Sequence, residues 1–141
     1  MREILFRGKR IDNGEWIYGW YIKADIHWHK YGVHKDWIVC RAIQNGGICN
    51  VLGRYAVNPE TVGQYTGLCD KNGNKIFEGD IVKFDFYFDN PQLVKWNNEW
   101  CAFEPIFDAR PIHAYPILCD TNRVEVIDNI HDNKNLLEVE L

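Results

Sequence analysis

The sequence predicts a mainly β fold, in which a small barrel-like antiparallel sheet carries an N-terminal β-hairpin and one short C-terminal helical turn. Three stretches alternate with the period of two that strands have. Clusters of Asn, Asp and Gly, which favour chain reversal, punctuate them. The 141 residues are enough for one domain with a real core, and 46% of them are hydrophobic.

The first stretch predicts a hairpin with strands at Glu3 to Phe6 and Trp16 to Ile22. Asp12-Asn13-Gly14 lies between them and accepts the positive φ angles of a tight turn. In the second strand Trp16, Tyr18, Trp20 and Ile22 fall on one face, and Ile17, Gly19 and Tyr21 on the other. Aromatic residues on both faces predict a strand that is covered on both sides. The next segment, residues 24–37, has no sustained period and is interpreted as a loop or a flexible hairpin tip, and residues 44–50 contain another turn.

The second stretch begins at the turn Asp70 to Gly73, which leads into a short strand at Lys75 to Phe77. After a break at Glu78-Gly79-Asp80 the alternation is clean. It places Val82, Phe84, Phe86 and Phe88 on a buried face, and Lys83, Asp85, Tyr87 and Asp89 towards water.

The third stretch, LVKWNNEWCAF, allows two hairpin registers. A two-residue loop at Asn97-Asn98 would place Trp96 opposite Glu99. A three-residue loop would place Trp96 opposite Trp100 and Val94 opposite Ala102. We favour the second register because matched apolar pairs stabilise a sheet.

The chain then predicts a strand at Val124 to Ile127, and Asp132 as the cap of one helical turn at Asn133 to Leu137. The predicted organisation is a single domain over residues 1–141, with an N-terminal β region at 1–62 and a barrel-like β region at 63–141.

Composition excludes several protein classes. Interspersed charges argue against disorder, and the start MREILFRGKR has no apolar run long enough for a signal peptide or a spanning helix. Five cysteines without a C-x-x-C pair predict buried, reduced thiols and a cytoplasmic location. A net charge of −4 opposes binding to a phosphate backbone.

Two segments contain candidate metal ligands, and each also has a structural explanation. Asp70, Asn72 and Asn74 imitate the first ligands of a calcium loop, but Gly73 is misplaced and Ile81 stands where a bidentate Glu is required. His27, His29 and His34 are the other candidate ligands, since His27 and His29 point the same way in an extended chain. Alternatively, these histidines are simply polar residues of an exposed loop and have no function there. We therefore predict no metal and no cofactor.

Catalysis and nucleic-acid binding have weaker support. The chain has no serine, its carboxylates are scattered, and no histidine neighbours a cysteine in a way that predicts a nucleophile. Six Trp, seven Tyr and seven Phe are enough for a stacking platform, but most occupy alternating positions that core packing explains. Basic residues are sparse outside Arg2 to Arg10.

One long block, VNPETVGQYTGLCDKNGNKIFEGDIVKF at Val57 to Phe84, resembles the YopX family of small phage and prophage proteins. The resemblance extends to REILFRGK, LVKWNNEW and VEVIDNIHDNKNLL. Family members commonly carry Gly where Asp128 stands and Pro-Glu where Lys134-Asn135 stand, and residues 24–37 fall outside the pattern. The resemblance implies a mostly β fold and a phage or prophage origin, and it brings no established activity or catalytic residue.

We therefore expect an accessory protein that binds a host or phage protein in the bacterial cytoplasm, with homo-oligomers left open and no membrane partner. The alternative is single-stranded nucleic-acid binding by a small β-barrel, which a basic and aromatic groove would favour. An uncharacterised enzyme is the third hypothesis, which converging carboxylates or histidines in a pocket would favour.

Overall fold

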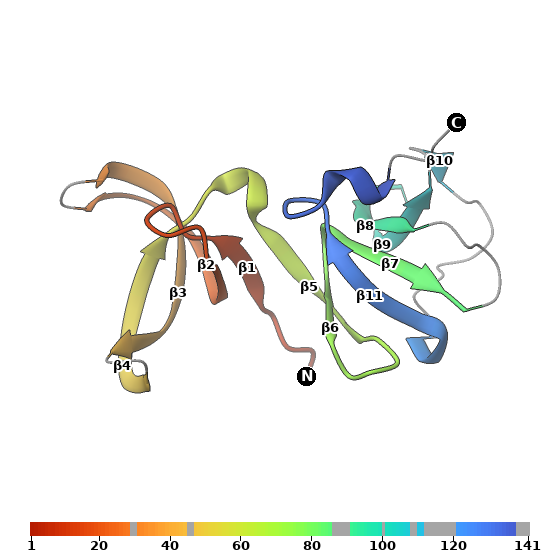
Figure 1. Cartoon of the computed structure of the whole chain (residues 1–141). Helices are drawn as coiled ribbons and strands as arrows, with labels where there is room; N and C mark the ends of the chain where they lie inside the picture. The colour runs from red at the N-terminus through yellow and green to blue at the C-terminus, as the bar shows by residue number, and fades with distance from the viewer. Residues whose placement is uncertain are drawn as a thin grey trace. The chain divides into compact units, whose positions relative to one another are not determined.

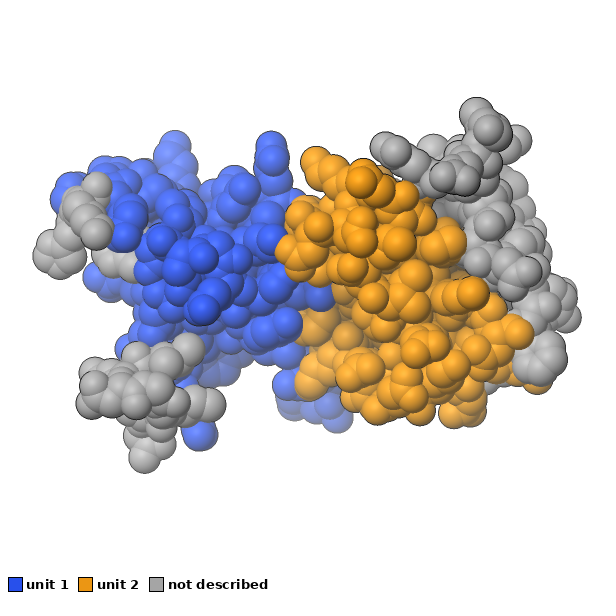
Figure 2. Space-filling view, in the orientation of Figure 1, with its two compact units in different colours: residues 1–64 blue, residues 65–141 orange. Residues whose placement is uncertain are grey.

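The computed structural model describes residues 1–28, 31–44, 47–85, 91–99, 101–107, 110–111 and 121–137 (Figure 1). The chain divides into two compact units, which Figure 2 colours separately. Unit 1 is Met1–Gln64 and unit 2 is Tyr65–Leu141. All strand pairings in the described ranges are antiparallel, and 3₁₀ turns are the only helical elements there. The prediction of a mainly β fold is confirmed.

Unit 1 is a meander of strands that ends in a 3₁₀ turn. Its elements are β1 (Phe6–Lys9), β2 (Trp16–Trp28), β3 (Gly32–Gln44), β4 (Gly47–Ala56) and η2 (Pro59–Thr61). The strand order is β4-β3-β2-β1, and β1 also pairs with the start of β5 (Gly63–Cys69). Ile17, Ile38 and Val57 form the core, and Phe6, Tyr21, Cys40, Tyr55 and Val62 pack against it.

The predicted N-terminal hairpin is confirmed, with one correction to its first strand. Gly14 has φ +72°, and Lys9 pairs with Trp16 across the turn. However, β1 covers Phe6–Lys9 and not Glu3 to Phe6. The Lys9 amide donates to Thr61 Oγ1 at 2.8 Å, a partner 52 residues away that local patterning does not reveal.

Residues 24–37, interpreted as a loop or a hairpin tip, instead lie mostly in strands. β2 and β3 pair as far as Trp28 and Gly32, with a bulge between Lys23 and Ile26. A bulge inserts an extra residue and reverses the apolar alternation, which explains why the sequence shows no sustained period here. The Trp37 indole secures the bulge by donating to the carbonyls of Ala24 and His34, both at 3.0 Å.

Unit 2 continues from β5 into β6 (Lys75–Phe77), its antiparallel partner. A second sheet has the order β10-β9-β8-β7-β11, and it does not close into a barrel within the ranges listed above. Its strands are β7 (Asp80–Phe84), β8 (Gln92–Asn97), β9 (Ala102–Phe107), β10 (Arg110–Pro111) and β11 (Val124–Asn129). The core of unit 2 consists of Ile76 from β6 together with Val82, Val94, Phe103 and Val124 from the second sheet. Phe84 and Val126 pack against this core.

The predicted alternation along β7 can be followed as far as Asp85. Val82 is buried, Phe84 packs against the core, and Lys83 and Asp85 are exposed, as expected. Ile81 is buried as well, so this strand is covered on both faces at that position. Phe86, Phe88, Tyr87 and Asp89 lie outside the described residues.

The predicted register of the β8–β9 hairpin is wrong. Trp96 pairs with Phe103, and Val94 with Pro105, because four residues and not three connect the strands. Cys101 adopts φ +50°, the one positive φ among the described residues other than glycine, and so completes the longer loop. The apolar pair that forms is Trp96 with Phe103, whose ring centroids lie 5.0 Å apart.

The C-terminal strand and helical turn are both present, as β11 and the 3₁₀ turn η5 (Lys134–Leu137). Another 3₁₀ turn, η4 (Thr121–Arg123), precedes β11. Asp132 Oδ2 accepts a hydrogen bond from Asn129 Nδ2 at 2.6 Å. Among the described helices, none is long and apolar enough to cross a membrane.

Gly73 closes the predicted turn between β5 and β6 with φ +83° and open space around its missing side chain. Gly73→Val should therefore lower the free energy of unfolding by on the order of 1 kcal/mol, since a β-branched residue resists positive φ. Urea denaturation measures this. A variant as stable as the wild type would contradict the assignment of the turn.

Candidate binding surface

The sheet of unit 1 exposes a cluster of large apolar side chains. Strand pairing places Trp20 opposite Val39, Val39 opposite Arg54, and Arg41 opposite Leu52, so their side chains share one face. We call this surface the aromatic face and define it by Tyr18, Trp20, Ile22, Arg41, Leu52 and Arg54. All six are exposed: 58% of Trp20, 62% of Leu52 and 47% of Tyr18 is accessible to solvent.

This exposure corrects two sequence-based expectations. β2 is not covered on both sides, because Ile17 and Gly19 face the core whereas Tyr18 and Trp20 face solvent. The alternating aromatic positions are therefore not all explained by core packing. On the same face of β3, Trp37 is buried beside the bulge, so the exposed apolar area ends near Ile22.

Two cationic side chains lie over the ring of Trp16, which borders one end of the aromatic face. The Arg7 guanidinium carbon is 4.7 Å from the Trp16 ring centroid and Lys9 Nζ is 5.4 Å from it. Trp16 is on the same side of β2 as Tyr18 and Trp20.

Unit 1 differs in charge from the chain as a whole. Its sequence has nine basic and six acidic residues, whereas that of unit 2 has seven basic and fourteen acidic residues. The net charges are +3 and −7, so the overall −4 conceals a basic unit.

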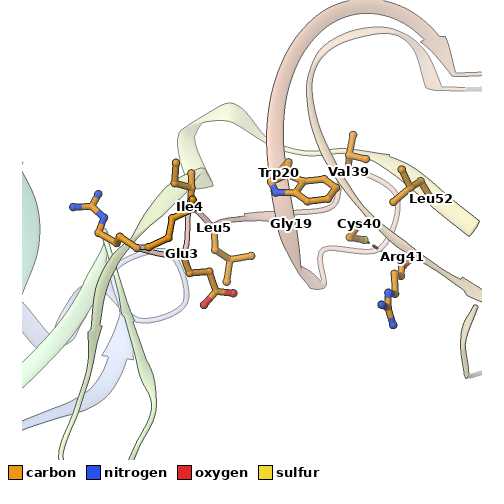
Figure 3. Close-up of a pocket in the computed structure, with 11 residues that line it drawn as sticks. Glu3, Ile4, Leu5, Gly19, Trp20, Val39, Cys40, Arg41 and Leu52 are labelled. Carbon is orange, nitrogen blue, oxygen red and sulfur yellow. Dashed lines mark hydrogen bonds between the residues drawn. The ribbon is translucent and has the colours of Figure 1, made fainter. Parts of the chain in front are cut away.

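A pocket of about 550 Å³ adjoins the aromatic face (Figure 3). The N-terminal residues Met1 to Leu5 line one side, and Gly19, Trp20, Val39, Cys40, Arg41 and Leu52 line the other. Burial raises the pKa of the Cys40 thiol, an effect that the nearby Arg10 charge partly offsets. The pocket therefore favours a protonated thiol, and its lining does not bring together carboxylates or histidines for acid–base chemistry.

The histidine candidates do not come together as a chelate. Ile26 pairs with His34 and His27 with Val33, so His27 and His34 project from opposite faces of the hairpin. His29 lies outside the described residues. Among the residues that are described, no group of three His, Cys, Asp or Glu side chains is placed to hold a metal ion.

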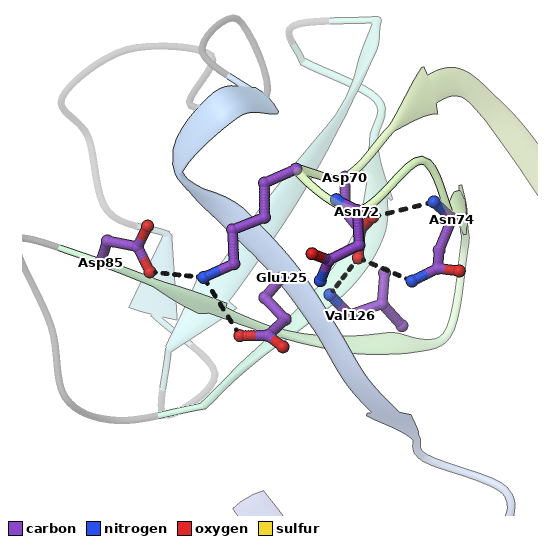
Figure 4. A network of polar contacts seen from close by, with 7 residues as sticks. Asp70, Asn72, Asn74, Asp85, Glu125 and Val126 are labelled. Carbon is purple, nitrogen blue, oxygen red and sulfur yellow. Dashed lines mark hydrogen bonds and ion pairs between the residues drawn. The ribbon is translucent and has the colours of Figure 1, made fainter.

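The Asp70 turn, the other candidate metal site, uses its carboxylate for structure (Figure 4). Asp70 Oδ1 accepts from the amides of Asn72 and Asn74, both at 2.9 Å. Asp70 Oδ2 accepts from the Val126 amide at 3.0 Å and from Asn74 Nδ2 at 3.3 Å. The oxygens that a calcium ion would require are thus directed at N–H donors.

Lys71 adds an ion-pair network at the surface beside this turn. Its Nζ lies 3.0 Å from Asp85 and 3.2 Å from Glu125 (Figure 4). The hydrogen bonds that the Lys71 ammonium donates to the carboxylates of Asp85 and Glu125 raise the pKa of Lys71. This network connects the turn to β11, the strand that contains Glu125.

We expect melting curves recorded with and without EDTA to coincide, since the described ligand candidates serve the turn or diverge. Differential scanning fluorimetry of protein purified without chelator checks this. A clear fall in melting temperature on chelation would restore His27, His29 and His34 as ligands.

Comparison with known proteins gave one family match. The family model described as YopX protein matches residues 5–138. A search of curated proteins found no match. Among solved structures, the crystal structure of protein EF1440 from Enterococcus faecalis is similar, with a TM-score of 0.50 and 20% identity over 98% of this chain and 100% of that one. That similarity concerns the fold.

Proposed function

Because this chain belongs to the YopX family, we propose that it is a phage or prophage accessory protein that binds a protein partner in the bacterial cytoplasm. The observation that carries the proposal is the aromatic face, where Trp20 and Leu52 are both more than half exposed. Contiguous exposed apolar side chains rimmed by polar groups are typical of protein interaction sites. Trp and Tyr dominate the energetics of such interfaces.

The composition of the face favours a protein over other ligands. Ile22 and Leu52 are aliphatic side chains, which pack well in a protein interface but cannot stack on a base. Arg41 and Arg54 lie beside them and supply polar groups at the rim. The pocket next to Trp20 could receive one anchoring side chain of the partner.

Affinity capture from the bacterial host with matched variants tests this function. Leu52→Glu should abolish capture of the partner, whereas Ile127→Glu should leave it intact, since Ile127 is an exposed aliphatic residue of unit 2. Equal melting temperatures of the two variants control for folding. A partner that both variants retain would contradict the role of the aromatic face.

Single-stranded nucleic acid is the second candidate, which the cations over Trp16 favour. Ring stacking beside Arg and Lys is the usual basis of such binding. However, only Tyr18 and Trp20 of the aromatic face carry exposed rings, and the excess positive charge of unit 1 is small.

We therefore expect binding to labelled single-stranded DNA and RNA to be weaker than about 1 μM at physiological salt, because few phosphates can be neutralised. Fluorescence anisotropy across a salt series measures this. Tighter binding with a steep salt dependence, lost in Trp20→Ala, would support the nucleic-acid function instead.

A further inference from the structure

The outer edge of β4 presents backbone groups that have no partner in the described structure. β4 is the last strand in its sheet, with β3 on one side. The Val57 amide donates to the Asp36 carbonyl at 3.0 Å, which makes Trp37 and Ala56 a non-hydrogen-bonded pair. Because pair types alternate along an antiparallel ladder, Arg54 and Leu52 also belong to non-hydrogen-bonded pairs. Their N–H and C=O groups therefore point away from β3.

Ala56 supports this geometry, because its carbonyl points outward and accepts a hydrogen bond from the Ile11 amide at 3.0 Å. Within the described part of unit 1, the backbone groups of Leu52 and Arg54 have no such partner. Their side chains are both exposed and both lie on the aromatic face. The same two residues thus present main-chain donors, main-chain acceptors, an apolar group and a cation.

We propose that this edge binds an extended segment of the partner protein, which adds an antiparallel strand beside β4 with an acidic residue opposite Arg54 and an apolar residue opposite Leu52. This inference rests on the proposed function. The antiparallel direction continues the arrangement of the sheet and makes the recognised pattern acidic-x-apolar, read from the N-terminus of the segment. Main-chain hydrogen bonds give such additions their affinity, and alternate side chains give their specificity.

Charge favours an acidic partner over a second copy of this chain. Arg41, opposite Leu52 on β3, and Arg54 form no ion pair with a carboxylate in the described residues. Two copies pairing through β4 would bring both arginine pairs to one surface, where like charges repel. A segment with an acidic residue would instead neutralise them.

The test uses a labelled ten-residue peptide of Thr and Val with Asp-Thr-Leu at its centre, together with a peptide in which Lys replaces Asp. The full-length protein should bind the Asp peptide at least about tenfold more tightly than the Lys peptide. Arg54→Glu should reverse this preference. Hydrogen exchange should slow at the amides of Leu52 and Arg54 when the Asp peptide is bound.

A pair of variants separates the main chain from the side chain. Arg54→Gln removes the charge and keeps the outward N–H, whereas Arg54→Pro removes both and leaves the hydrogen bonds to β3 in place. We expect Arg54→Pro to bind at least about tenfold more weakly than Arg54→Gln, and hydrogen exchange at the Cys40 and Tyr55 amides to confirm that the β3–β4 pairing is intact.

Three outcomes would overturn the inference. They are equal binding by Arg54→Pro and Arg54→Gln, no binding of either peptide at about 1 mM, and a dimer in sedimentation that Arg54→Pro converts to a monomer. If neither peptide binds but Leu52→Glu still abolishes capture of the partner, the proposed protein-binding function is retained. The partner then does not bind by adding a strand to the edge of β4.

Discussion

Replacing Gly19 with alanine should destabilise unit 1 by about 3 kcal/mol or prevent it from folding, because overpacking a closely packed site costs about 1–3 kcal/mol and sometimes more. A Cβ atom on Gly19 would lie 2.2 Å from the Val39 carbonyl oxygen and 3.0 Å from Cys40 Cβ. The nearest atom belongs to the backbone of β3, which pairs with β2 at the next residue, Trp20. The strands would have to separate to make room.

Gly14→Ala is the control for the clash, because a Cβ atom on Gly14 would meet no atom within 4 Å. Unlike the clash at Gly19, its effect comes from the φ angle of +72° at Gly14. Its cost should be about 1 kcal/mol, from backbone conformation alone. Urea denaturation followed by circular dichroism and tryptophan fluorescence compares the two variants. Equal stability of Gly19→Ala and the wild type would show that β2 and β3 do not approach as closely as described.

Asp70→Ala should have the second large effect, a loss of about 3 kcal/mol of unfolding free energy. Asp70 is 6% exposed and accepts four hydrogen bonds, of which three come from main-chain amides. Alanine leaves these donors without an acceptor, and the Val126 amide belongs to a strand 56 residues away. Lys71→Ala, in the exposed ion-pair network beside it, should have a much smaller effect.

The pH dependence of stability gives an independent measurement of Asp70. Desolvation by itself would raise the pKa of Asp70, but hydrogen bonds from Val126, Asn74 and Asn72 outweigh it and lower the pKa below its ordinary value of 3.8. The unfolded chain therefore binds the proton first as the pH falls. The stability from the carboxylate is complete at neutral pH and is lost between about pH 4 and the lowered pKa.

Urea denaturation of wild type and Asp70→Asn between pH 7 and pH 2 should show this loss. The difference in unfolding free energy between the two proteins should be constant at neutral pH and narrow as Asp70 becomes protonated. A difference that is independent of pH would mean that the carboxylate charge makes no contribution.

Turns were predictable from the sequence because their chemistry is local. Asp12-Asn13-Gly14 and Asp70 to Gly73 carry the residues that positive φ and side-chain capping require, and the structure uses both segments as turns. The β8–β9 register was not predictable in the same way. It depends on Cys101 adopting a positive φ, which few residues of its type do.

The candidate binding surface was only half predictable. Alternation showed that Trp16, Tyr18, Trp20 and Ile22 share a face, but not whether anything covers that face. The sequence does not identify Arg41, Leu52 and Arg54 as part of this surface, because these residues come together only through the pairing of β3 with β4. A bulge between Arg41 and Ile43 also interrupts the period-two signal that could have identified these strands.

The hydrogen bond between Asp70 and Val126 has a consequence for the order in which the protein forms during synthesis. In unit 1 the pairs β1–β2, β2–β3 and β3–β4 are consecutive hairpins, so each can form soon after its strands leave the ribosome. The pairing of β1 with β5 joins distant residues, but it needs no residue beyond Gln64. In unit 2, by contrast, β7 pairs with β8 along one edge and with β11 along the other. The second pairing can form only after β11, the last of the described strands in the chain, has been synthesised. Until then the Asp70 turn lacks its Val126 donor and β7 has an unpaired edge. Ribosome-bound chains that end before β11 should consequently carry a folded unit 1 joined to a unit 2 that is open to proteases and chaperones.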